Sequence, residues 1–151
     1  MFRIMLVDDE PLILAGITSL LDWEANECRI VAKATSGQQA LELMEEARPD
    51  IVITDIRMPA MDGIEFMRRA RERGEEAQFI LLTNLEEFSL AKEAMRLGAV
   101  DYLVKLELSE EKLLEALTRA KENRRVHLAA NPGAADRGRS GAAATAEAAQ
   151  K

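Results

Sequence analysis

Five polar side chains stand where apolar runs of this chain end, and their types suit one kind of chemistry. In chain order they are Asp8 and Asp9 after the first run, Asp55 after the third, Thr83 after the fourth and Lys105 after the fifth. If these runs are neighbouring parallel strands, their ends share one edge of the sheet, so the five side chains face one crevice. Carboxylates suit a hard divalent cation, and an ammonium suits phosphoryl oxygens. The pattern predicts a site for a metal ion and a phosphoryl group.

The apolar runs have the length and composition of strands. Residues 2–7 (FRIMLV) are followed by Pro11, which is well suited to the first turn of a helix. Residues 51–54 (IVIT) are apolar or branched throughout, as expected of a central strand that is covered on both faces. The other expected strands are 29–34, 79–82 and 100–104.

Segments with helical spacing of apolar residues separate these strands. The first runs from Leu12 to Leu21, and capping residues are expected to open three others: Ser36, Asp62 and Ser109. The fourth of the five helices has its apolar positions at Phe88, Ala91, Met95 and Leu97. Alternating strands and helices favour right-handed crossovers and a parallel sheet with helices on both faces. We therefore expect an α/β fold, a doubly wound five-stranded parallel sheet of flavodoxin-like order 2-1-3-4-5.

Bulk composition narrows the class of protein. The 151 residues suffice for one domain, and 48% hydrophobic with 31% charged residues is ordinary for a globular protein. No run approaches the roughly 20 apolar residues of a membrane span, and no signal peptide precedes the first strand. We expect a cytoplasmic protein without membrane contact. The formal charge of −7 disfavours direct binding of nucleic acid by this chain.

The last part of the chain differs from the rest. Residues 129–151 hold ten alanines and three glycines but no Leu, Ile, Val or aromatic residue. We expect one domain over residues 1–128 and an Ala/Gly-rich flexible tail or linker over 129–151. The single cysteine, Cys28, has no second thiol to pair with, and we expect neither it nor His127 to carry chemistry.

Several segments of residues 1–128 are similar to one known family. The segments LVDDEP, PDIVITDIRMPAMDG, LLT and DYLVK together resemble the receiver domain of bacterial two-component response regulators, which has the CheY-like form of the flavodoxin-like fold. The runs LVDDEPLI, DWEANE and EEFSLAKEAMRLGAVDYLVK look most like receivers that precede an AraC-type DNA-binding domain. Such a domain is absent from these 151 residues. We therefore expect either a receiver whose natural chain continues or a free-standing receiver with a short tail.

The resemblance implies a set of residue roles. A sensor histidine kinase would transfer a phosphoryl group to Asp55 in a Mg²⁺-dependent reaction. Asp9 and Asp55 would bind Mg²⁺ with help from Asp8, and the backbone carbonyl of Arg57 would complete the metal shell. Lys105, with the hydroxyl of Thr83, would contact the phosphoryl oxygens, a placement that also suits the charge of the phosphoryl transition state. The domain would catalyse only its own aspartyl phosphorylation and dephosphorylation, and would otherwise not be an enzyme.

The resemblance also implies a conformational switch and an output. Thr83 would move toward the phosphoryl group and Tyr102 on the fifth strand would rotate, a change that controls an output such as transcription. A homodimer would form through the fourth helix, the fifth strand and the fifth helix. DNA would be bound only through an output domain that this sequence lacks.

Two residues depart from the family pattern. Receivers commonly have proline after the active-site lysine, across a cis bond, whereas Leu106 follows Lys105 here. A cis bond without proline costs about 3–4 kcal/mol, so we expect a trans bond and a rearranged loop. Asn84 stands directly after Thr83, where receivers tend to have Gly or Ala, and we expect it to alter the rates of phosphorylation or dephosphorylation.

Other functions fit this sequence less well. A flavin mononucleotide site needs a hydroxyl- and glycine-rich phosphate loop after the first strand, where Asp8, Asp9 and Glu10 would repel the phosphate. A haloacid-dehalogenase-type phosphatase separates its two acids by one residue, whereas Asp8 and Asp9 are adjacent. The main alternative is a degenerate receiver that acts as a phosphorylation-independent protein-interaction module.

Overall fold

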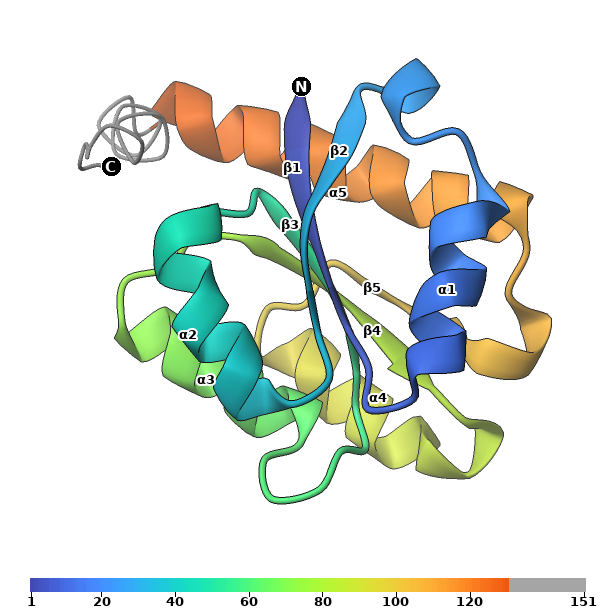
Figure 1. Cartoon of the computed structure of the whole chain (residues 1–151). Coiled ribbons are helices and arrows are strands. Elements are labelled where there is room, and N and C mark those ends of the chain that lie inside the picture. Colours follow the sequence, from blue (N-terminus) through green and yellow to red (C-terminus); the bar gives the residue numbers. More distant parts are fainter. Residues whose placement is uncertain (131–151) are drawn as a thin grey trace.

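One parallel sheet organises residues 1–130, which are the residues that the computed structural model describes. Its strands are β1 (Phe2–Val7), β2 (Cys28–Ala34), β3 (Ile51–Asp55), β4 (Gln78–Thr83) and β5 (Asp101–Val104). They lie in the order β2-β1-β3-β4-β5, as Figure 1 shows. The helices are α1 (Pro11–Leu20), α2 (Gly37–Ala47), α3 (Gly63–Glu72), α4 (Phe88–Arg96) and α5 (Glu110–Ala130). The expected doubly wound fold and its strand order are confirmed.

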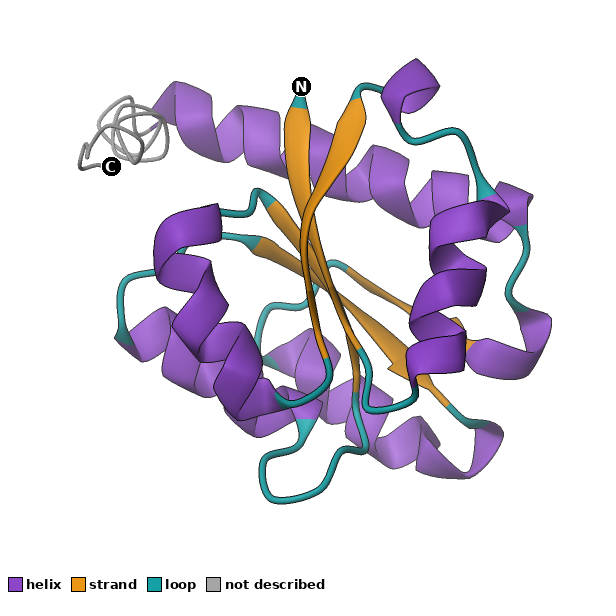
Figure 2. Cartoon of the chain, viewed as in Figure 1, coloured by secondary structure: helices purple, strands orange, loops and turns teal. Residues whose placement is uncertain are grey.

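The sheet has an apolar layer on each face. Along β1, Met5 and Val7 point to one face and Ile4 and Leu6 to the other, and all four side chains are buried. Helices α2, α3 and α4 cover the first face, while α1 and α5 cover the second (Figure 2). This double coverage explains why the strands are almost continuously apolar, since neither face of the sheet meets water.

Short polar side chains begin three of the helices, as their sequence positions predict. The Ser36 hydroxyl accepts a hydrogen bond from the Gln39 amide at the start of α2. Asp62 accepts one from the amide of Glu65 at 2.8 Å where α3 begins. Ser109 receives a hydrogen bond from the Lys112 amide in the first turn of α5. Each bond satisfies a backbone donor that would otherwise have no partner within its helix.

Helix α4 differs from the pattern expected of it. Among its apolar positions Ala91 is buried, but Phe88 is 53% exposed and Met95 and Leu97 are also exposed. The buried residues of this helix are instead the small Ala91 and Ala94, with Leu90 partly buried beside them, while Phe88 and Met95 face outward.

Helix α5 is the longest helix of the described part of the chain and ends at Ala130. Ala129 and Ala130, which we expected in the flexible tail, continue this helix, and the rest of that expected tail lies outside the described residues. Near its end, the guanidinium of Arg124 is buried and donates from Nε to Asp50 at 3.0 Å, which fastens α5 to the start of β3. Within residues 1–130, none of the helices combines the length and hydropathy that crossing a membrane requires.

Candidate functional site

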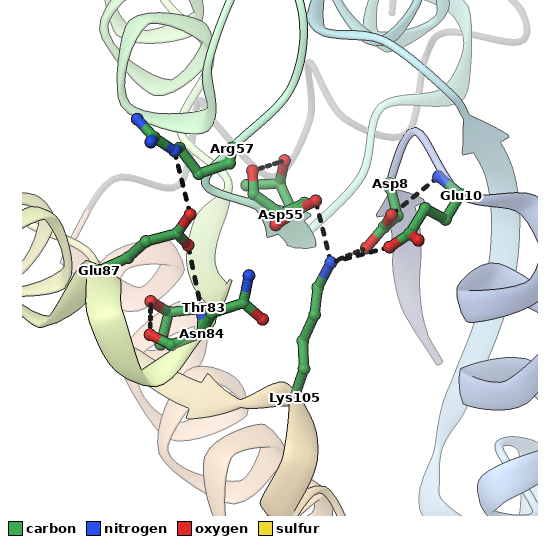
Figure 3. A network of polar contacts seen from close by, with 9 residues as sticks. Asp8, Glu10, Asp55, Arg57, Thr83, Asn84, Glu87 and Lys105 are labelled. Atoms are coloured by element: carbon green, nitrogen blue, oxygen red, sulfur yellow. Dashed lines mark hydrogen bonds and ion pairs between the residues drawn. The ribbon is translucent and has the colours of Figure 1, made fainter.

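The carboxyl ends of the central strands place three charged groups together. The last residue of β1 pairs in register with Thr54, which precedes Asp55, and the last residue of β4 pairs with Val104, which precedes Lys105. Because parallel strands in register end at the same edge, Asp8, Asp55 and Lys105 emerge side by side. Figure 3 shows the three side chains converging from β1, β3 and the end of β5.

The ammonium of Lys105 is the centre of this cluster. Its Nζ atom donates a hydrogen bond to Oδ2 of Asp55 at 3.0 Å and lies 3.1 Å from Oδ2 of Asp8. Glu10 approaches the same atom with Oε1 at 3.5 Å. Asp8 is fully buried, Asp55 is 3% exposed and the Lys105 side chain 13%, so little water screens these charges.

Burial shifts the proton affinities of this cluster. It raises the pKa of Asp55 from 3.8 to about 6, although the hydrogen bond from Lys105 opposes the change, and repulsion from Asp8 adds to it. Burial also raises the pKa of Asp8. For Lys105, burial favours the neutral amine, but the hydrogen bond to Asp55 and the ion pair with Asp8 outweigh it and the pKa is raised. The cluster therefore holds its carboxylates at an energetic cost that a cation would relieve.

The acidic residues after β1 have the donor chemistry of a hard-cation site. Carboxylate oxygens of Asp8, Asp9 and Glu10 all lie within 4.8 Å of one another. Oδ1 of Asp8 accepts a hydrogen bond from the Glu10 amide at 2.9 Å, whereas the buried Oδ2 accepts none from the described residues and has only the ion pair with Lys105. A buried oxygen without a hydrogen bond, in a set of oxygen donors only, fits Mg²⁺. Figure 3 shows the Lys105 ammonium between Asp55 on one side and Asp8 and Glu10 on the other.

Three residues expected in the site have their side chains bonded elsewhere. The Thr83 hydroxyl donates to the carbonyl oxygen of Asn84 at 3.0 Å, within its own loop. The Arg57 guanidinium, whose backbone carbonyl we expect to bind metal, pairs through Nε with Oε2 of Glu87 at 3.0 Å. Tyr102 is half-buried on β5, its ring edge-on to that of Phe88 with centroids 6.3 Å apart. Figure 3 shows Thr83, Asn84, Arg57 and Glu87 on the side of the charged cluster away from Asp8.

The two departures from the family pattern have clear structural outcomes. The bond between Lys105 and Leu106 is trans, as expected, and the chain turns at once into a 3-10 turn, Lys105–Glu107. Leu106 is thereby 84% exposed, yet Lys105 reaches Asp55. Asn84 is the N-cap of the 3-10 turn Leu85–Glu87: its amide donates to Oε1 of Glu87 at 3.3 Å, and the Glu87 amide donates to the Asn84 carbonyl oxygen at 3.1 Å.

Two acids in this region were not singled out as site residues by the sequence reasoning. We expected Glu10 only to break the first strand and, with Asp8 and Asp9, to repel a flavin phosphate, although three consecutive acids at a strand end are a signal for a cation site. Glu87 is 7% exposed and closes a capping box with Asn84. The spacing of an Asn three residues before a Glu is a recognisable capping signal.

Gly63, the first residue of α3, supports the backbone of Asp55. Its amide donates to the Ile56 carbonyl at 2.7 Å, and a Cβ atom at this position would lie 2.3 Å from the carbonyl oxygen of Asp55.

We expect Gly63→Ala to lower the free energy of unfolding by about 2 kcal/mol in urea titrations, because either α3 or Asp55 must shift. The control is Gly16→Ala in α1, where a Cβ meets open space and helix propensity favours Ala by up to about 1 kcal/mol. Equal effects of the two substitutions would contradict the steric argument.

Known proteins share both the sequence and the fold of this chain. Residues 4–118 match the family model described as the response regulator receiver domain. The transcriptional regulatory protein YesN of Bacillus subtilis, itself uncharacterized, is 38% identical over 117 residues, which cover 78% of this chain and 32% of that protein. The positive alginate biosynthesis regulatory protein of Pseudomonas aeruginosa is 40% identical over 85% of this chain and 50% of its own length. The chain thus spans between about a third and a half of these curated relatives.

Solved structures agree with these sequence relatives. The receiver domain of AraT, a response regulator from Geobacillus stearothermophilus, superposes with a TM-score of 0.76 at 36% identity, covering 83% of this chain and 97% of that one. A two-component transcriptional regulator AraC from Clostridium phytofermentans gives a TM-score of 0.78 at 26% identity, with coverages of 85% and 99%. With the family model matching most of its length, this chain belongs to the response regulator receiver domain family.

Proposed function

We propose that this domain accepts a phosphoryl group on Asp55 from a sensor histidine kinase and uses it to switch an output. The observation that carries the proposal is the buried Asp55 carboxylate held 3.0 Å from the Lys105 ammonium at the edge of the sheet. An oxygen of Asp55 attacks the phosphorus atom, the bond from phosphorus to the donor's nitrogen or oxygen breaks, and the electron pair leaves with the donor. The product is an aspartyl phosphate.

Residues of this chain stabilise the charge that moves during this transfer. The Lys105 ammonium, already hydrogen-bonded to Asp55, neutralises an equatorial phosphoryl oxygen as the donor departs. The Thr83 hydroxyl supplies a further hydrogen bond once it leaves the Asn84 carbonyl. Burial of Asp55 excludes the water that would compete with these contacts. Asp8, Asp9, Asp55 and the Arg57 carbonyl would hold Mg²⁺, with Glu10 as a further oxygen donor beside Asp8 and Asp9, and the ion would supply positive charge that offsets the charge of the phosphoryl group.

The domain's output follows from its relatives and its exposed surface. Both curated relatives are regulatory proteins longer than this chain, so we place this receiver upstream of a transcriptional output module. Thr83 and Tyr102 are the switch residues in this proposal. The exposed apolar side chains of α4 and of the C-cap residue after it, Phe88, Met95 and Leu97, belong to the surface of α4, β5 and α5 through which a homodimer would form. DNA contact would come only from the output module.

Incubation with acetyl phosphate and Mg²⁺, followed by intact mass measurement, tests the proposal. We expect the wild type to gain the mass of one phosphoryl group and Asp55→Asn to gain none, because the amide is not a nucleophile toward phosphorus. Asp22→Asn, which alters an exposed acid between α1 and β2, is the matched control and should label like the wild type. A wild type that stays unlabelled, or an Asp55→Asn variant that labels equally, would favour the passive interaction module instead.

A further inference from the structure

The loop that follows Asp55 is tied to the start of α4 by one ion pair. Arg57 lies two residues after Asp55, and its Nε atom is 3.0 Å from Oε2 of Glu87, in the residue before α4. The Glu87 side chain is only 8% exposed, whereas that of Arg57 is 68% exposed. A nearly buried carboxylate therefore depends on a cation that stands mostly in water, an unequal arrangement that a competing anion can disturb. We call this contact the Arg57–Glu87 bridge (Figure 3).

Glu87 also holds the loop that carries Thr83. Its Oε1 accepts a hydrogen bond from the Asn84 amide at 3.3 Å, and the Glu87 amide donates to the Asn84 carbonyl oxygen at 3.1 Å. The Thr83 hydroxyl donates to the carbonyl of the same Asn84. Glu87 thus holds Asn84 at both its amide and its carbonyl oxygen, and the same carbonyl accepts the Thr83 hydroxyl.

A phosphoryl group on Asp55 would compete for Arg57. It replaces a carboxylate by a group with about two negative charges and three strong acceptor oxygens, which attract a guanidinium strongly. The Arg57 side chain is 68% exposed and lines an open pocket of about 420 Å³ together with Asp62, so its neighbours leave it room to move. Once Arg57 turns toward the phosphoryl group, the nearly buried Glu87 carboxylate loses its counter-charge. A buried charge without a partner is costly, so the Glu87 side chain is then expected to move into water.

We propose that the Arg57–Glu87 bridge holds this receiver in its resting conformation and that phosphorylation of Asp55 opens it by recruiting Arg57. The inference rests on the proposed phosphoacceptor function. Glu87 then acts as a positioning residue: its release frees the Asn84 loop, so that the Thr83 hydroxyl can turn to the phosphoryl group. The same movement reaches Tyr102, because the Phe88 ring next to Glu87 packs against the Tyr102 ring.

The composition of the chain offers a direct readout of this bridge. Tyr102 is the single tyrosine and Trp23 the single tryptophan of the sequence. In NMR spectra of protein with labelled tyrosine and tryptophan, the Tyr102 resonance therefore reports on the conformation of α4. The Trp23 indole donates to the Thr18 carbonyl in α1, so its resonance shows whether the rest of the domain stays folded. In unphosphorylated protein we expect Glu87→Gln and Arg57→Met to shift the Tyr102 resonance toward its position in acetyl phosphate-treated wild type. The ratio of open to resting conformer should rise about tenfold, as for loss of one charged hydrogen bond.

Two further variants separate the bridge from general effects of charge. Glu93→Gln breaks a similar ion pair, between Arg68 of α3 and Glu93 of α4 at 3.1 Å, without touching the Asn84 loop. It should leave Tyr102 at the wild-type position, and Arg57→Lys, which keeps the cation, should largely restore that position. Glu87→Gln keeps an acceptor for the Asn84 amide, and an unchanged Trp23 signal will verify its fold.

The proposal that the Arg57–Glu87 bridge holds the resting conformation is wrong if the Tyr102 signal is unchanged in both Glu87→Gln and Arg57→Met. It is also wrong if Glu93→Gln moves this signal equally. Intact mass measured on the same samples keeps the two proposals apart. If the wild type gains no phosphoryl group, the phosphoacceptor function fails, while the comparison of unphosphorylated variants still decides whether the bridge sets the resting position of α4.

Discussion

Replacing Lys105 by Met is expected to lower the free energy of unfolding by about 3–5 kcal/mol at pH 8 and by much less at pH 5. Lys105 is ion-paired with Asp8 and Asp55, both of which are buried. Removing the cation leaves two buried carboxylates uncompensated, which is far more costly than losing a surface pair. Methionine preserves much of the length and packing of the side chain, so the loss reflects charge.

The dependence on pH follows from the direction of the carboxyl shifts. The pKa of Asp55 is already about 6, and loss of the Lys105 hydrogen bond, which lowers it, raises it further. A carboxyl whose folded pKa is raised binds its proton more tightly when folded, so stability falls as pH rises from the unfolded value near 3.8 through the raised value. Above the raised value the whole cost is present. At pH 5 most of the variant's Asp55 is protonated, and little of the cost remains.

Urea unfolding at the two pH values measures this effect. Lys112→Met is the matched control, because Lys112 pairs with Glu107 at 3.3 Å but both side chains are more than half exposed. Such a pair contributes less than about 1 kcal/mol. A loss of stability in Lys105→Met that is the same at pH 5 and pH 8 would show that packing, and not charge, dominates.

Labelling by acetyl phosphate should also slow about a hundredfold in Lys105→Met, since one electrostatic contact to the transition state is gone.

Much of the fold could be predicted because local signals and the sheet rule agreed. The strand-like runs, the caps at Ser36 and Asp62 and the strict alternation of strands and helices all agree with a doubly wound parallel sheet. That topology in turn placed Asp8, Asp55 and Lys105 at one edge before any distance was known. Such polar groups are informative in sequence because each follows directly on a buried strand, where a charged side chain has no role in the core.

The outer layer of the site could not be predicted in the same way. Whether Thr83 bonds to its own loop or to Asp55 depends on a rotation about one side-chain bond, which sequence spacing does not determine. The partner of Arg57 is a residue 30 positions away on another loop, and only the packing of α4 brings Glu87 there. Helix α4 illustrates the same limit, because the periodic pattern included Phe88 among its apolar positions without distinguishing buried from exposed ones.

In the presence of a chelator, Asp55→Asn is expected to make the protein more stable at pH 7.5, by about 2 kcal/mol. A pKa of about 6 in place of 3.8 means that ionised Asp55 opposes folding by about 3 kcal/mol. That pKa already includes the hydrogen bond from Lys105. The substituted amide brings a buried NH₂ donor beside the Lys105 ammonium, and leaving this donor without an acceptor offsets about 1 kcal/mol of the gain. Since the raised pKa lies above the unfolded value, the advantage of the variant should be complete above pH 6 and disappear as the pH falls toward 4.

Added Mg²⁺ should make the wild type more stable than Asp55→Asn, the reverse of the order expected with chelator. Magnesium at about a hundred times its dissociation constant stabilises a folded site by about 2.7 kcal/mol. The wild type, with Asp8, Asp9 and Asp55 all present, should gain this amount in thermal unfolding, while Asp55→Asn and Asp9→Asn gain much less. Glu115→Gln, which removes an exposed carboxylate from α5, should respond like the wild type and so exclude a general effect of salt. If Mg²⁺ stabilises all four proteins equally, the acidic residues at the edge of the sheet do not bind the ion. Loss of a metal ligand weakens metal binding, so the variants would have to gain less stability than the wild type.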